Sequence, residues 1–312
     1  MNKPCVRISV RNMIEFLLRS GDIVSGIVSP QLLQQGTQAH RKTQAAAEEG
    51  YISEVKLSCQ VELEKFILLV EGIADGIIPS GETPLIDEIK STSIPLDLIH
   101  EDYNNLHWAQ AICYGWMYLN QSGKESAIIR LTYIHRSTHE AKQYTRRYSS
   151  NELKEFFYHL IEQYSQWVEL DLNHKENRNK SIHALNFPFP QYRKGQRRIA
   201  EYTYRAVRDG KRLFVHAPTG TGKTVSVLFP SVKAMGEGLI EKVFYLTAKT
   251  VTRQVAEQTI KLMEKNGLIF RSVTLTSREK ACFVDTPVCD GEKCPYARGH
   301  YDRINAAIRD IL

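Results

Sequence analysis

The sequence predicts an α/β protein with two domains in tandem. Its 312 residues are about twice the ~150 residues of a common domain. Hydrophobic periodicity in the first half gives the order helix, helix, three strands, helix, strand and helix. In the second half, a strand is followed by a glycine-rich turn and a helix, and then by another strand and helix. The second order is typical of a parallel sheet covered by helices. We expect a mixed α/β domain at 1–172, a linker at 173–190 and a partial parallel-sheet domain at 191–312.

The elements of the first half follow from capping residues, periodicity and glycines. Ser9 predicts the start of a helix that ends near residue 20, before Gly21. Alternating apolar residues predict strands, and apolar residues at helical spacing predict helices. The strands are expected at 52–63, 66–78, 84–91 and 126–134, and further helices at 30–49, 104–121 and 150–170.

The second half begins after a polar stretch, Asp171–Lys180, and the sequence Phe187–Pro190, which cannot continue a helix. Helices are then expected at 192–209, from 222, at 250–266 and at 295–312, with strands at 211–217 and 242–247.

Composition excludes several classes of protein. Apolar residues make up 42% and charged residues 24%, which is ordinary for a soluble globular chain. No apolar run approaches the ~18 residues of a membrane span, and charges interrupt the N-terminus where a secretion signal would be apolar. We therefore expect a cytoplasmic protein without a membrane partner.

Charge is unevenly placed along the chain. Residues 191–212 hold eight Lys or Arg against two acidic residues, which equals the whole net charge of +6. Such a block indicates either a polyanion partner or a solvated helix face. Residues 54–102 hold eleven Asp or Glu against three Lys, which indicates either a divalent-metal site or a polar surface.

A phosphate-binding loop is the sharpest motif. Ala217–Thr224 reads A-P-T-G-T-G-K-T, follows an apolar strand and opens a helix. Glycines let backbone N–H groups surround a phosphate chain at the helix N-terminus. Lys223 would reach the β- and γ-phosphates of ATP and Thr224 would bind Mg²⁺. The alternative is a glycine-rich turn with a chance lysine. The predicted nucleotide-binding residues are Gln196, Thr219, Gly220, Thr221, Gly222, Lys223 and Thr224.

The motif A-P-T-G-T-G-K-T resembles the phosphate loop of superfamily 2 helicases. Two neighbouring segments narrow the resemblance to the DinG/XPD branch. Residues 191–196 resemble the adenine-sensing segment of that branch, with Gln196 as the base contact. Residues 245–250 resemble its next motif, which contacts the nucleic-acid backbone. The resemblance implies ATP, Mg²⁺ and a DNA partner, single-stranded or forked, and a role in DNA repair.

Three clustered cysteines follow. Cys282, Cys289 and Cys294 suggest a metal site or an iron–sulfur cluster, because disulfides are rare in a cytosolic chain. Spacing alone leaves zinc open. DinG/XPD-like helicases carry a cysteine-ligated [4Fe–4S] insertion at this place, so the resemblance implies that cluster. A fourth ligand is then expected beyond Leu312.

The acidic block contains the elements of a metal-dependent nuclease. Asp75 ends one apolar strand, and Glu88 and Lys90 face the same side of the next. Paired carboxylates bind Mg²⁺ or Mn²⁺, and the lysine would stabilise charge at the attacked phosphate. A strand with E-x-K is also common as a solvated edge. Glu71 is expected near the site, whereas Glu54 is expected at the surface.

This arrangement resembles PD-(D/E)xK nucleases, and two helices narrow it to the RecB-like branch. Residues 36–40 match its G-x-x-x-H helix, which implies that His40 is a metal ligand with Asp75 and Glu88. Residues 110–114 match its Q-x-x-x-Y helix, which implies that Gln110 and Tyr114 orient Lys90 and contact DNA.

The leading hypothesis is therefore a DinG/XPD-type DNA helicase fused to an N-terminal nuclease, represented by its N-terminal portion. We expect the chain as written to bind nucleotide but not to hydrolyse ATP at a useful rate, because an Asp-Glu-x-x motif and a second motor domain are missing from it. One alternative is a truncated, non-catalytic remnant that binds nucleotide or DNA. Another is a phosphate-loop ATPase without a nucleic-acid role.

Overall fold

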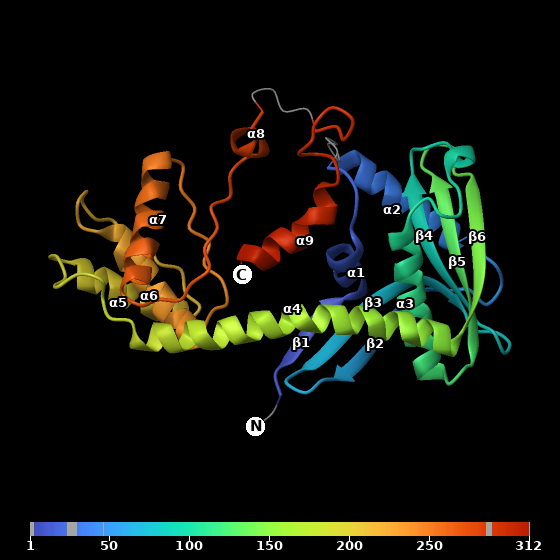
Figure 1. The fold of residues 1–312 in the computed structure, drawn as a ribbon, viewed down its shortest axis with the longest axis horizontal. Helices are drawn as coiled ribbons and strands as arrows, with labels where there is room; N and C mark the ends of the chain where they lie inside the picture. The colour runs from blue at the N-terminus through green and yellow to red at the C-terminus, as the bar shows by residue number, and fades with distance from the viewer. Residues whose placement is uncertain (1–2, 24–29, 46, 285–288, 312) are drawn as a thin grey trace. The chain divides into compact units, whose positions relative to one another are not determined.

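The computed structural model describes residues 3–23, 30–45, 47–284 and 289–311. The chain divides into two compact units (Figure 1). The first consists of Met1–Glu169 with Phe283–Leu312, and the second of Leu170–Cys282. The first unit contains a mixed sheet with parallel and antiparallel strand pairs, which confirms the prediction of an α/β fold.

The sheet of the first unit has six strands in the order β1-β3-β4-β5-β6, with β2 paired to β3 outside that path. Four of them, β2 to β5, match expected strands; β1 and β6 were not foreseen. Their bounds are β1 Cys5–Ser9, β2 Ile52–Glu62, β3 Ile67–Ile78, β4 Leu85–Thr92, β5 Ser126–His135 and β6 Ala141–Ser149. β6 is rich in Lys, Arg and Gln and half of its positions are exposed, so its sequence lacks the apolar alternation that reveals a strand.

The edge of β3 opposite β2 is shared by two strands. β1 pairs in parallel with residues 67–71, and β4 pairs antiparallel with residues 76–78. Residues 72–75 lie between these pairings, so the sheet splits beside Asp75. Beyond the pairing, residues 88–90 of β4 remain paired with β5 only. The split leaves an opening between Asp75 of β3 and the part of β4 that follows Asp87.

Helices cover both faces of this sheet. α3 (Asn105–Ser122) contacts β4 and β5 on the face of Glu88 and Lys90. α2 (Pro30–Ala45) packs Ala39 against Ile89 and Ile134 on the opposite face, because neighbouring strand residues point to opposite sides. α1 (Val10–Leu18) begins as predicted at Ser9, whose hydroxyl accepts a hydrogen bond from Asn12 N at 3.1 Å.

The segment 289–311 also belongs to the first unit. It ends in α9 (His300–Ile311), and hydrogen bonds attach it to the residues that follow α1. Asp22 accepts a bond from Gly299 N at 2.7 Å, and Asp302 accepts one from Gly21 N at 2.8 Å. A Cβ at Gly291 would lie 1.6 Å from the Asp22 carboxylate, so only glycine allows this close approach. The cysteine-bearing segment is therefore held against the end of α1.

The second unit is helical within its described part. Its helices are α5 (Gln196–Arg208), α6 (Lys223–Gly236), α7 (Thr250–Lys265) and the short α8 (Arg278–Ala281). α6 and α7 begin within one residue of their expected starts. They pack with the end of α4 around a core of apolar side chains: Ile182, Leu185, Leu228, Val232, Met235, Ala256, Ile260, Met263 and Leu268.

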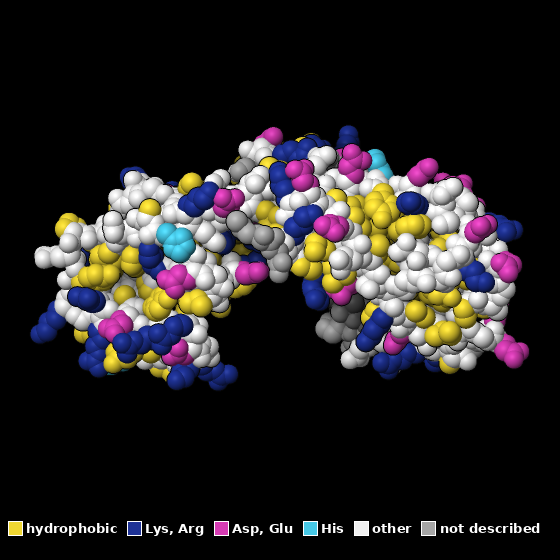
Figure 2. All heavy atoms as spheres, turned by 90° about the horizontal axis from the view of Figure 1, so that it is seen from below, with side chains coloured by type: hydrophobic (Ala, Val, Ile, Leu, Met, Phe, Trp, Pro, Cys, Tyr) yellow, Lys and Arg dark blue, Asp and Glu magenta, His cyan; other side chains and the backbone are white. Residues whose placement is uncertain are grey.

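Two sequence predictions for the second unit were wrong. Residues 211–217 and 242–247 form no strand, and the predicted parallel sheet is not present among the described residues. The two segments do not pair with each other, and a strand needs a hydrogen-bonded neighbour. Phe214 is 93% exposed and Leu246 is 88% exposed, and Figure 2 shows hydrophobic side chains at the surface of this unit.

α4 (Ser150–Ala184) is longer than the predicted helix at 150–170 and extends through most of the expected linker. Charged residues are good helix formers, and pairs four residues apart add support. Lys175 lies 2.9 Å from Asp171, and Lys180 pairs with Glu176. No described helix is both long and apolar enough to cross a bilayer.

Candidate functional sites

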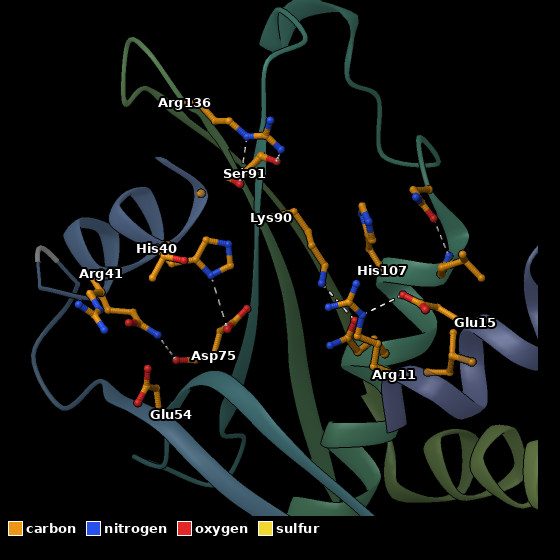
Figure 3. Close-up of a pocket in the computed structure, with 17 residues that line it drawn as sticks. Arg11, Glu15, His40, Arg41, Glu54, Asp75, Lys90, Ser91, His107 and Arg136 are labelled. Carbon is orange, nitrogen blue, oxygen red and sulfur yellow. Dashed lines mark hydrogen bonds and ion pairs between the residues drawn. The ribbon is translucent and has the colours of Figure 1, made fainter. Parts of the chain in front are cut away.

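A cavity of about 580 Å³ opens beside the split in the sheet of the first unit (Figure 3). Side chains from β3, β4, α1, α2 and α3 line it. Four of the predicted site residues are among them: His40, Asp75, Lys90 and Gln110. The fold thus gathers side chains that are up to 70 positions apart in the sequence, His40 to Gln110.

Asp75 fills the place where β3 and β4 separate. Its Oδ2 accepts a hydrogen bond from Ile89 N at 2.7 Å, so the carboxylate replaces a missing ladder partner of β4. Its Oδ1 lies 3.7 Å from Nδ1 of His40, and Figure 3 shows the imidazole turned toward it. Gln44 donates to Asp75 O at 2.9 Å, which ties α2 to the same residue. A Cβ at Gly36 would lie 3.0 Å from the Ser91 hydroxyl, so glycine lets α2 approach β4.

A chain of hydrogen bonds connects the remaining predicted residues. Lys90 Nζ donates to Glu88 Oε1 at 2.5 Å and to Gln110 Oε1 at 3.1 Å. Gln110 Nε2 donates to the Tyr114 hydroxyl at 3.3 Å. Tyr114 packs on Gly72, where any Cβ would lie 2.5 Å from its ring. The lysine ammonium is therefore held at two points and directed into the cavity.

Glu88 is the most perturbed acid of the site. It is 1% exposed, and burial raises the pKa of its carboxyl to about 8 although the charge of Lys90 opposes that shift. Its Oε2 is buried and has no hydrogen-bond partner among the described residues. A buried polar atom without a partner costs about 1–3 kcal/mol.

The donor chemistry of these residues fits a divalent cation. Asp75 and Glu88 carry the hard oxygen atoms that Mg²⁺ and Mn²⁺ prefer, and Oε2 of Glu88 has no hydrogen-bond partner among the described residues, although Glu88 is buried and does not line the cavity. Within the described ranges, however, no group of three or more His, Cys, Asp or Glu side chains is placed together to hold a metal ion.

Other cavity residues were not foreseen. Glu54 is exposed, as the sequence predicted, and it also lines the cavity, between the ladder pairs Ser53–Gly76 and Val55–Ala74. Its φ of +54° lies in the left-handed region, which is rare for a residue other than glycine. A sequence pattern does not reveal such a backbone conformation. Glu71, expected near the site, is not among the cavity residues and lies 3.8 Å from Arg7.

Three arginines and a second histidine also line the cavity. Arg11, Arg41 and Arg136 come from α1, α2 and the β5–β6 turn (Figure 3). His107 lies one turn before Gln110, a spacing that could have pointed to it. Burial and the nearby charge of Lys90 lower the pKa of His107 to about 3, so its ring is neutral beside the Tyr133 hydroxyl, 2.9 Å away.

The phosphate-binding loop lies in the second unit. Gly220 and Gly222 have φ values of +80° and +74°, which only glycine adopts without strain. Lys223 Nζ donates to Ala217 O at 2.9 Å and to Pro218 O at 2.7 Å, so a phosphate would have to replace these contacts. Thr221 donates to Pro218 O at 2.9 Å. Thr219 lies in the turn of the same loop, and Thr224 lies in the first turn of α6.

The start of α5 is attached to this loop. Gln196 Oε1 accepts from Arg193 N at 2.9 Å, and its Nε2 donates to Gly222 O at 3.4 Å. Arg193 also donates to Gly220 O at 2.6 Å. The predicted adenine-sensing residue therefore contacts the backbone of the predicted phosphate loop.

The three clustered cysteines are distributed over both units. Cys282 ends the second unit, whereas Cys289 and Cys294 belong to the first, and none of them forms a disulfide. The part of the chain that the structure describes does not bring them into a metal-binding group. Residues 285–288 of the predicted cluster segment lie outside the described residues.

Comparison with known proteins identifies one part of the chain. A comparison with curated proteins gave no match. A solved structure described as "Crystal structure of SSO0001" is 17% identical, with 50% of this chain and 76% of that chain covered and a TM-score of 0.34. That likeness is too low to support an argument about function. The family model described as DEAD/DEAH box helicase matches residues 194–285. Residues 194–285 therefore match a DEAD/DEAH box helicase domain, and this match supports ATP binding and an association with nucleic acid.

Proposed function

We propose that the cavity of the first unit is a metal-dependent nuclease site fused to a DNA helicase domain of the DinG/XPD type. One observation carries this proposal: Asp75, Lys90 and Gln110 come from three different elements and line one cavity with His40 on a fourth, and Glu88, which does not line the cavity, accepts a hydrogen bond from Lys90 behind it. Along the chain, these residues follow the order histidine, aspartate, glutamate, lysine and glutamine, which is the order in the RecB-like motifs described above. A solvated edge strand would leave these groups exposed and separate.

The side chains have distinct tasks in phosphodiester hydrolysis. A divalent cation, when bound by Asp75 and Glu88 with His40 beside them, would lower the pKa of a water and neutralise charge on the phosphate. Lys90 supplies a fixed positive charge where negative charge develops on the attacked phosphate. Gln110 and Tyr114 hold Lys90 in place through the hydrogen bonds described above. The water oxygen forms a bond to phosphorus and releases a proton, the P–O bond to the leaving oxygen breaks, and the leaving oxygen takes up a proton.

The helicase domain supplies the second half of the proposal. The phosphate loop, with Lys223 and Thr224, would hold ATP and Mg²⁺, and Gln196 would contact the adenine. The resemblance to the DinG/XPD branch supports a [4Fe–4S] cluster on Cys282, Cys289 and Cys294, and a single-stranded or forked DNA partner. The structure does not support the cluster, so that part rests on the resemblance alone.

A cleavage assay tests the nuclease. End-labelled single-stranded DNA is incubated with the full chain and Mn²⁺, and products are separated by length. We expect cleavage that Asp75→Ala reduces by about 100-fold or more, because the carboxylate holds the metal. Glu71→Ala is the matched control, since it removes a carboxylate from the same strand outside the cavity. Equal cleavage by the wild type and Asp75→Ala would show that the nuclease assignment is wrong.

A further inference from the structure

The exposed face of α5 carries a strip of positive charge. At 3.6 residues per turn, Arg197, Arg198, Arg205 and Arg208 lie on one side of this helix, around Glu201, and Lys194 lies in the turn before the helix. All five are exposed, whereas Gln196, Ala200 and Thr203 are buried on the other side. Figure 2 shows Lys and Arg side chains gathered on one side of this unit. We call these five residues, with Lys211 and Arg212 after the helix, the basic strip.

Most of the basic strip has no acidic partner. Arg205 lies 2.6 Å from Glu201, and Arg208 lies 2.8 Å from Asp209. The other members form no ion pair with any residue that the structure describes: Lys194, Arg197, Arg198, Lys211 and Arg212. Solvated helix faces usually intersperse the two signs of charge. Unpaired cations that follow one helix are the footprint of a polyanion.

An exposed aromatic ring lies beside these cations. Tyr202 is 43% exposed, and the guanidinium of Arg198 lies 5.5 Å from the centre of its ring. Proteins that bind single-stranded nucleic acid combine a basic track with aromatic rings on which unpaired bases stack. A duplex keeps its bases stacked on each other and offers only its phosphates to such a surface.

The basic strip is continuous with the nucleotide-binding loop. α5 begins at Gln196, whose side chain donates to Gly222 O, and Arg193 donates to Gly220 O. α5 also packs along α6, the helix that the loop opens. A ligand on α5 and a phosphate in the loop would thus contact parts of one packed body.

We propose that the exposed face of α5 binds the backbone of single-stranded nucleic acid, with Tyr202 as a stacking position. This surface lies outside the phosphate loop and outside the predicted backbone contact at 245–250. It does not depend on the nuclease assignment, which is tested by cleavage and not by binding.

The test is binding of a labelled oligodeoxythymidine of about 20 nucleotides, measured by fluorescence anisotropy. The full chain is titrated in EDTA, so that no metal-dependent cleavage occurs, from about 50 to about 200 mM salt. Arg197→Gln with Arg198→Gln should weaken binding roughly tenfold at low salt and reduce the salt slope by about 1.4, since each contact contributes about 0.7. Tyr202→Ala should weaken single-strand binding and leave duplex binding unchanged.

The matched control removes two exposed lysines of the same unit, Lys261 and Lys265 of α7, by substitution with Gln. It changes the net charge equally, and we expect the wild-type salt slope. An equal loss in both double variants would overturn the proposal, because the effect would then be one of net charge. Unchanged binding in the α5 variant would overturn it as well.

Discussion

The two candidate sites are built in opposite ways. The cavity of the first unit takes its side chains from separate elements, and its Asp75 and Lys90 are held by partly buried hydrogen bonds. The phosphate loop of the second unit is one contiguous segment, and the exposed Lys223 at its end donates, within the described part of the chain, to carbonyl groups of the loop itself. The first site therefore depends on tertiary structure, whereas the second is a local conformation of the backbone.

The two sites therefore differ in how strongly their side chains affect the stability of the fold. Glu88 is buried at the end of a paired region, and its charge state affects the stability of the unit around it. Lys223 lies at the surface, so we expect its loss to affect the proposed ATP binding without changing the fold. The predictions below separate these two situations, from the largest expected effect to the smallest.

The largest effect on stability is a dependence on pH that comes from Glu88. Its pKa is raised by burial from the ordinary 4.5 to about 8, so the folded state binds this proton more tightly than the unfolded state. The stabilisation is fully present below pH 4.5 and is lost as pH rises through about 8. Without divalent metal, the free energy of unfolding should fall by a few kcal/mol over this window in the wild type but not in Glu88→Gln.

Urea unfolding followed by tryptophan fluorescence measures this, because Trp108, Trp116 and Trp167 all belong to the first unit. Glu152→Gln is the control, since that carboxylate is exposed and has a lowered pKa. Parallel pH profiles for the wild type and Glu88→Gln would contradict the assignment of this effect to Glu88.

A second prediction compares the same substitution in the two sites. Lys90→Ala removes the donor to Glu88 and Gln110 and should lower the free energy of unfolding of the first unit by about 1–3 kcal/mol. Lys223→Ala should change stability by less than about 0.5 kcal/mol, because its side chain is exposed. Binding of a fluorescent ATP analogue should nevertheless be lost in Lys223→Ala and kept in Lys90→Ala. Equal free energies of unfolding for Lys90→Ala and Lys223→Ala would contradict the claim that only the first site depends on tertiary structure.

The smallest effect concerns the strained backbone at Glu54. A left-handed φ disfavours any side chain, so Glu54→Gly should raise the free energy of unfolding by about 0.5–1 kcal/mol. Lys56→Gly, on the same strand with ordinary geometry, should instead lower it by about 0.5–1 kcal/mol. Urea melts of the two variants provide the comparison. If both glycines destabilise the protein equally, the backbone at Glu54 carries no strain.

Much of the first unit could be predicted from the sequence. The period of two along β4 placed Glu88 and Lys90 on one face, and the period of 3.6 along α3 placed Gln110 and Tyr114 one turn apart. Ser9 marked the start of α1 correctly. These features are local, and local spacing is what a sequence records directly.

The remaining features of the fold depend on contacts between distant segments, which sequence patterns do not reveal. The split of β3 between β1 and β4, and with it the bond from Ile89 N to Asp75, arises from pairing across the sheet. The strands expected at 211–217 and 242–247 have apolar sequences but no hydrogen-bonded neighbour, so propensity alone did not form them. α4 continued through the expected linker because charged residues support a helix as well as they support a loop.

Titration of the metal-free protein with Mn²⁺, followed by electron paramagnetic resonance in the absence of nucleotide, tests the central claim most directly. We predict one binding site in the wild type, the same site in Lys223→Ala, and its loss in Asp75→Asn, because Asp75 and the free oxygen of Glu88 are the proposed donors. Asp75→Asn keeps the size of the side chain and a hydrogen-bond acceptor for Ile89 N. Identical Mn²⁺ binding by the wild type and Asp75→Asn would contradict a metal site in this cavity.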